Sequence, residues 1–84
     1  MVRDELVVAI ARKPFRPFVI AVTDGKRYAI RRPELVMVTL NSVVIGMVVD
    51  ESLPDGYPLI DFFVVVDLLH VVRLEEVPDD RSQS

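Results

Sequence analysis

A hairpin pattern in residues 18–31 places the strongest constraint on the fold. Residues 18–23 alternate with a period of two, Asp24-Gly25 follows, and a second short strand pattern runs through residues 26–31. Asp-Gly between two alternating segments is typical of a tight β-hairpin turn. The alternation assigns outward and core-facing positions to the second strand: Arg27, Ala29 and Arg31 outward, Tyr28 and Ile30 toward the core.

Four further segments have the Val- and Ile-rich composition of strands. Two of them are apolar on both faces, which is typical of strands covered on one side by the core and on the other by a helix or a partner. A turn-rich loop at residues 50–58 separates the first pair from the second. The predicted strands are residues 35–40, 43–49, 59–66 and 71–77, and a single helical turn at residues 67–70 precedes the last. In this last strand we expect Arg73 and Glu75 on one side and Val72 and Leu74 on the other.

The N-terminal residues predict one short helix. Asp4 and Glu5 precede its apolar positions, and Pro14 ends it, which suits both the helix dipole and the usual stop signal. A helix this short is only marginally stable in isolation. We therefore expect Leu6 and Ile10 to pack on another element.

These elements predict a mainly β domain. We expect a small SH3-like or Sm-like antiparallel barrel of five to six strands with an N-terminal helix, because closing the sheet removes aggregation-prone edges. The alternative is an α+β fold, an open antiparallel sheet backed by the helix. Residues 1–77 are expected to form the single domain and residues 78–84 a frayed polar tail.

The size and composition limit how this domain can be stabilised. The chain has 84 residues, no cysteine and one histidine, which excludes disulfides and a structural zinc site. The spacing of the acidic residues near the long loop does not match an EF-hand and is interpreted as a solvated acidic loop, so we expect no metal and no cofactor. A domain this small is only marginally stable without an additional stabilising feature. With disulfides and zinc excluded, association with another chain is the remaining possibility. The apolar run at residues 35–49 is too short and too interrupted to span a membrane, and no signal peptide is evident, so a cytoplasmic location is expected.

The net charge of -3 is unevenly distributed along the chain. Residues 1–32 carry eight basic and three acidic side chains, a balance of +5, whereas residues 33–84 carry two basic and ten acidic ones, a balance of -8. Such a chain can present a dipolar surface that favours head-to-tail association or steers a charged partner. The alternative is that strands from both halves interleave and the charges mix.

Several short motifs together resemble a family of short uncharacterised bacterial proteins. The resemblance covers nearly the whole chain and implies no known activity. It is carried by the motifs at residues 12–18 (RKPFRPF), 24–25 (DG), 32–34 (RPE), 42–46 (SVVIG) and 66–71 (VDLLHV). The order of a short helix, five strands and an early Asp-Gly turn is also similar to Sm-like RNA-binding proteins. The Asp and Asn pair and the Arg-Gly with which those proteins hold bases are absent here, so the likeness is one of topology.

Two candidate polar sites follow from the sequence. The basic residues Lys26, Arg27, Arg31 and Arg32 can form a phosphate-binding surface, as an Sm-like nucleic-acid binder would need, or only a solvated face. Asp67 and His70 can form an acid–base pair at the predicted corner, or can brace that turn through backbone hydrogen bonds. An enzyme would need a site completed across a subunit interface, so we expect no catalytic residue within one chain.

The apolar surplus is the remaining signal. We expect Val44, Val48, Phe63 and Val65 on the strand face opposite Val43, Ile45, Phe62 and Val64, and one short helix cannot cover all of this apolar surface. Large exposed apolar patches usually mark interfaces. We therefore predict a non-enzymatic protein-interaction module that forms a homo-oligomer and can engage a protein partner, rather than a nucleic-acid binder or an enzyme.

Overall fold

The computed structural model describes residues 2–50 and 52–77, and the predicted tail at residues 78–84 lies outside them. The chain is mainly β with an N-terminal helix, as predicted. None of the described helices reaches the length and apolarity needed to cross a bilayer. The elements in chain order are α1 (Val2–Ala11), β1 (Phe18–Val22), β2 (Arg27–Ile30), the 3₁₀ turn η1 (Pro33–Leu35), β3 (Val36–Val38), β4 (Ser42–Asp50), β5 (Leu59–Asp67), the 3₁₀ turn η2 (Leu68–His70) and β6 (Val71–Glu76).

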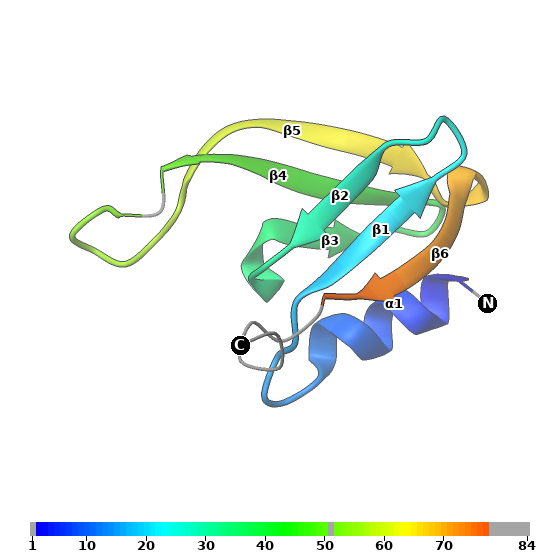
Figure 1. Cartoon of the computed structure of the whole chain (residues 1–84), viewed down its shortest axis with the longest axis horizontal. Coiled ribbons are helices and arrows are strands. Elements are labelled where there is room, and N and C mark those ends of the chain that lie inside the picture. The colour runs from blue at the N-terminus through cyan, green and yellow to red at the C-terminus, as the bar shows by residue number, and fades with distance from the viewer. Residues whose placement is uncertain (1, 51, 78–84) are drawn as a thin grey trace.

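The strands form two antiparallel sheets of three (Figure 1). One has the order β2-β1-β6 and the other β3-β4-β5. Within the described residues no strand pair joins the two sheets, so the predicted closure into a barrel is not observed. A physical reason is visible at η1, where Pro33 lacks a backbone N–H and the chain turns before β3 begins, so β2 and β3 do not run on as one strand.

The first hairpin follows the sequence prediction. Phe18 pairs with Ile30 and Ala21 with Arg27. Gly25 adopts a φ of 90°, which glycine tolerates without strain, and the Asp24 side chain accepts a hydrogen bond from the Lys26 backbone N–H at 2.9 Å. The alternation also holds, since Ile30 is fully buried and Tyr28 half-buried, whereas the intervening positions are exposed.

The predicted third strand, residues 35–40, is shorter than expected. Leu35 ends η1, so pairing to β4 begins at Val36 and ends at Val38. Thr39 closes the following turn, since its Oγ1 atom lies 3.0 Å from the backbone nitrogen of Ser42 and its own N–H donates to the Ser42 carbonyl at 2.8 Å. A threonine that bonds the turn in this way is drawn out of the ladder.

The predicted facing of the last strand is wrong for Val72. Val71 is buried and Leu74 packs on the core, but Val72 is 49% exposed. The cause is a register shift in the β1–β6 pair, in which Val22 pairs with Val71 while Ala21 pairs with Arg73. A bulge of this kind adds one residue to β6 and reverses the alternation beyond it.

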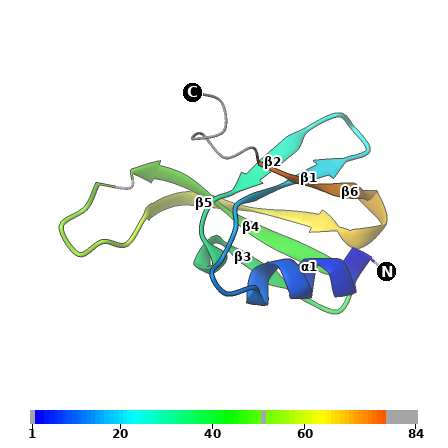
Figure 2. The ribbon, with the colours of Figure 1, turned by 60° about the horizontal axis from the view of Figure 1, so that its bottom comes forward.

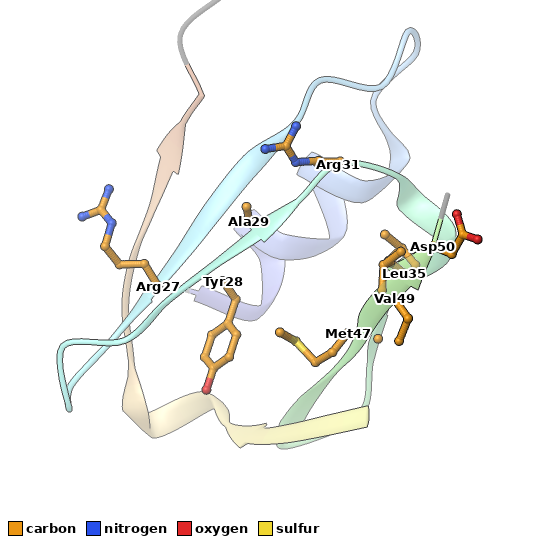
Figure 3. A pocket seen from close by; sticks show the side chains of 10 residues that line it. Arg27, Tyr28, Ala29, Arg31, Leu35, Met47, Val49 and Asp50 are labelled. Carbon is orange, nitrogen blue, oxygen red and sulfur yellow. The ribbon is translucent and has the colours of Figure 1, made fainter. Parts of the chain in front are cut away.

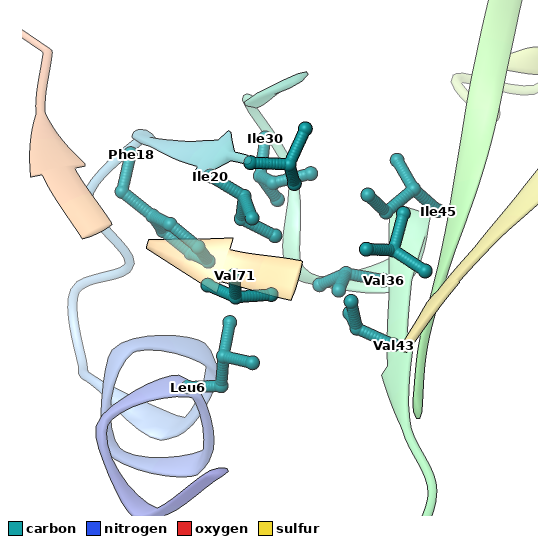
Figure 4. Packing of buried hydrophobic residues seen from close by; sticks show 10 residues of the cluster. Leu6, Phe18, Ile20, Ile30, Val36, Val43, Ile45 and Val71 are labelled. Carbon is teal, nitrogen blue, oxygen red and sulfur yellow. The ribbon is translucent and has the colours of Figure 1, made fainter. Parts of the chain in front are cut away.

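The core lies between the two sheets, and α1 covers one end of it (Figure 2). The helix contacts β3 from one sheet and β6 from the other, so it does not back a single open sheet as the alternative fold would require. Leu6 of α1 is fully buried there. In Figure 4, Val36, Val43 and Ile45 extend from the second sheet toward the residues of the first.

Candidate functional site

One face of the β3-β4-β5 sheet points away from the core. The register shows this, because Val43 and Ile45 of β4 are buried while Val44 between them pairs with Met37 on β3 and Val65 on β5. We call this surface the outer face. Its members are Met37, Val44, Gly46, Val48, Ile60, Phe63 and Val65.

The outer face is apolar and largely uncovered. Met37, Phe63 and Val65 are 66%, 63% and 66% exposed, and Val44 is half-buried. Large apolar side chains have areas of roughly 150–250 Å², so these exposed fractions correspond to on the order of 400 Å² of apolar surface. A patch of this size on a single chain is often functional. No charged residue belongs to this set.

A register shift changes the pairing near the far end of the outer face. Gly46 pairs with Phe63, whereas Val48 pairs with Ile60, so β5 contains one additional residue between these two pairs. The Ile60 side chain lies over Gly46, where an added Cβ would come within 3.0 Å of Ile60 Cδ1. A larger residue at position 46 would therefore displace Ile60.

The four predicted interface residues all lie on the outer face, but their exposures differ. Phe63 and Val65 are prominent, whereas Val44 and Val48 are half-buried. Sequence reasoning did not include Met37 or Ile60. Met37 belongs to a strand whose length was overestimated, and Ile60 reaches the outer face only because of the register shift, for which the sequence carries no signal.

The predicted basic surface is partly neutralised. Arg27 forms an ion pair with Glu75, which also accepts a hydrogen bond from Arg73 Nε at 2.6 Å. Arg32 lies 3.1 Å from a Glu34 carboxylate oxygen and donates to the Gly56 carbonyl. Of the four predicted basic residues, two are therefore held by protein groups, and Tyr28, the aromatic residue between them in sequence, is half-buried rather than exposed for base stacking.

Glu75 sits between two arginines, and this sets its charge. Partial desolvation raises the pKa of Glu75, but the hydrogen bond from Arg73 and the charges of Arg27 and Arg73 outweigh it, so the pKa lies below its ordinary value of 4.5. A phosphate that approaches Arg27 would therefore have to displace the ionised carboxylate of Glu75.

Asp67 and His70 occupy the predicted corner but do not bond to one another in the described structure. The Asp67 Oδ1 atom accepts a hydrogen bond from the Leu69 backbone N–H at 2.9 Å and caps η2. His70 Nδ1 lies 3.4 Å from Thr23 Oγ1, and the His70 carbonyl accepts from the Thr23 N–H at 2.9 Å. Both residues thus brace the corner, the second of the two readings of the sequence.

The acidic residues beyond β4 also make local bonds. Asp50 accepts hydrogen bonds from the hydroxyl and the backbone N–H of Ser52, and both lower the pKa of Asp50. Asp55 accepts from the Tyr57 N–H at 3.0 Å. Among residues 2–50 and 52–77, no three potential metal ligands gather.

A second surface feature is a groove between β2 and β4 (Figure 3). It encloses about 420 Å³ and combines apolar with charged walls. The Met47 side chain extends from β4 toward the ring of Tyr28, which projects from β2 into the same space. The lining residues are Arg27, Tyr28, Ala29, Arg31, Leu35, Gly46, Met47, Val48, Val49 and Asp50.

Comparison with known proteins adds no assignment. No protein-family model, curated protein or solved structure matches the chain.

Proposed function

We propose that the protein is a non-enzymatic interaction module that self-associates through the outer face of the β3-β4-β5 sheet. The observation that carries this proposal is the exposure of Met37, Phe63 and Val65 side by side on an apolar face, with the exposed Asp67 at its end. Burying such a face in a second copy removes apolar surface from water, at roughly 25 cal/mol for each Å².

The size of the outer face suits a homodimer. A stable interface buries about 800 Å² on each partner, of which about 65% is apolar in homodimers. On the order of 400 Å² of exposed apolar side chain, enlarged by a polar rim, approaches that composition. A second copy also offers the same apolar face, so the contact is self-complementary about a two-fold axis.

The flanking polar groups supply a rim. Ser42 pairs with Asp67 at one end of the β4–β5 ladder, next to the Val44 and Val65 pair. Asp67 already accepts a hydrogen bond within its own chain, so burial nearby does not leave its capping oxygen without a partner. A polar margin around an apolar centre is the usual anatomy of a specific interface.

We also propose that the two sheets are the halves of an opened SH3-like or Sm-like barrel. The antiparallel β1–β6 pair, the single turn η2 before β6 and the helix before β1 support this topology. It adds no function, since the same architecture serves many uses. The predicted basic surface gives no comparable support to nucleic-acid binding, because Arg27 and Arg32 form ion pairs with Glu75 and Glu34.

Matched surface variants test the self-association. Val65→Glu places a charge on the outer face, whereas Val72→Glu places the same charge on a comparably exposed valine of β6, outside that face. Light scattering after gel filtration should give a monomer for Val65→Glu and an unchanged dimer for Val72→Glu. If both variants keep the oligomeric state of the unaltered chain, the outer face is not the interface.

A further inference from the structure

Two strands present unpaired backbone edges to the groove between β2 and β4. The second strand pairs only with β1. The fourth pairs with β5 along its length, but with β3 only from Val43 to Ile45. In the described part of the chain, residues 46–50 of β4 therefore have no strand partner on the side away from β5, and these residues line the groove. Unpaired edges are templates for strand addition.

Apolar side chains line part of the groove. Met47 extends from one wall toward the ring of Tyr28 on the other, and Leu35 and Val48 add further apolar surface (Figure 3). Consecutive residues of both strands line the space, which shows that it runs along the strand edges rather than over one face. An extended segment with alternating apolar side chains fits such a site, because its backbone reaches the edge and every second side chain reaches the interior.

Charge at the groove selects the partner further. Arg31 directly follows β2 and lines the groove, with its guanidinium directed away from β4 in Figure 3; it is exposed and forms no ion pair with a described residue. Arg27, on the same wall, is held by Glu75. Asp50, on the opposite wall, already accepts a hydrogen bond from Ser52. Its negative charge would repel a carboxylate of the partner on that side of the groove. The groove is therefore complementary to a single carboxylate placed beside Arg31.

We propose that this groove binds an extended, mainly apolar peptide segment bearing one acidic residue, by strand addition between β2 and β4 with its carboxylate on Arg31. The partner is a protein with such an exposed segment. The groove shares Gly46 and Val48 with the outer face, but Tyr28, Arg31 and Met47 lie outside that face, so substitutions at these three residues test this activity apart from self-association.

The probe for a test is the peptide Thr-Val-Glu-Val-Thr-Val-amide with a fluorophore on its N-terminal amine, titrated with the full chain and followed by fluorescence anisotropy at low ionic strength. Two matched peptides accompany it. One carries lysine in place of glutamate, and the other carries N-methyl groups at alternate positions, which removes backbone donors while the side chains stay. Saturable binding of the first peptide, with at least tenfold weaker binding of both matched peptides, is expected.

Charge reversal in the protein completes the test. Arg31→Glu should weaken binding of the acidic peptide at least tenfold and strengthen binding of the lysine peptide, whereas Arg16→Glu, an exposed arginine outside the groove, should change neither. Circular dichroism of each variant shows whether it is folded. The inference is overturned if the acidic peptide does not bind up to millimolar concentration, if the two variants behave alike, or if N-methylation leaves the affinity unchanged. None of these results depends on the oligomeric state, which light scattering reports separately.

Discussion

Phe63 of β5 lies directly opposite Gly46 of β4 on the outer face. Because glycine has no side chain, the phenylalanine has no cross-strand side-chain neighbour at its own register position, and it remains 63% exposed. Cross-strand pairs are the usual means by which a sheet covers such a ring. The space over Gly46 is instead taken by Ile60.

Substitution of Gly46 should show how tightly Ile60 covers it. Gly46→Val should lower the free energy of unfolding by about 1–3 kcal/mol, because its branched side chain must displace Ile60. Gly46→Ala should change it by less than about 1 kcal/mol, since only the flexible end of Ile60 must move and alanine favours the folded strand entropically. Urea unfolding of both variants checks this. Equal stability of the two variants would show that Ile60 does not restrict the site.

The Glu75 carboxylate should make stability depend on pH. Its folded-state pKa lies below 4.5, so the charged form is favoured by folding. The stability it contributes is present above the unfolded pKa and is lost as the pH falls through the folded pKa. Denaturation midpoints measured between pH 6 and pH 3 should therefore fall less steeply for Glu75→Gln than for the unaltered chain. Parallel curves would contradict the arrangement with Arg27 and Arg73.

The corner between β5 and β6 should depend on Asp67 more than on His70. Asp67→Ala removes the cap of η2 and should cost about 1 kcal/mol of stability. His70→Ala removes only a 3.4 Å contact with Thr23 and should cost less than about 0.5 kcal/mol. Thermal unfolding compares the two. A larger loss for His70→Ala would assign the bracing role to the histidine.

The helix should be held by one side chain above all. Leu6 is fully buried at the end of the core, whereas Val8 on the same helix is 62% exposed. Leu6→Ala should therefore lower the free energy of unfolding by about 2–5 kcal/mol. Val8→Ala, the control, should change it by less than about 0.5 kcal/mol. Chemical denaturation monitored by circular dichroism measures both values.

The local elements were predictable from the sequence because they depend on near neighbours. The Asp24-Gly25 turn, the alternation that buries Ile30, and the single turn ending at His70 all follow from adjacent residues. The amphipathic placement of Leu6 follows from the same kind of pattern. These predictions are confirmed because turn chemistry and periodicity act over a few residues.

Other features depend on register and could not be predicted. The shift between Ala21 and Val22 exposes Val72, and the shift beyond Met47 brings Ile60 over Gly46. The groove arises because β3 pairs with only part of β4: the pairing stops at Val36 opposite Ile45, where η1 precedes β3. A bulge or a shortened strand depends on how segments distant in the sequence pair with one another, and the alternation within one strand carries no information about that pairing.

Self-association through the outer face is tested most directly by sedimentation equilibrium of the unaltered chain and of Phe63→Asp at micromolar concentration. The unaltered chain should have a mass twice the 9.5 kDa of one copy, and Phe63→Asp should have the mass of one copy while remaining folded. A mass of 9.5 kDa for the unaltered chain at all concentrations, or an unchanged dimer for Phe63→Asp, would contradict the role assigned to this face.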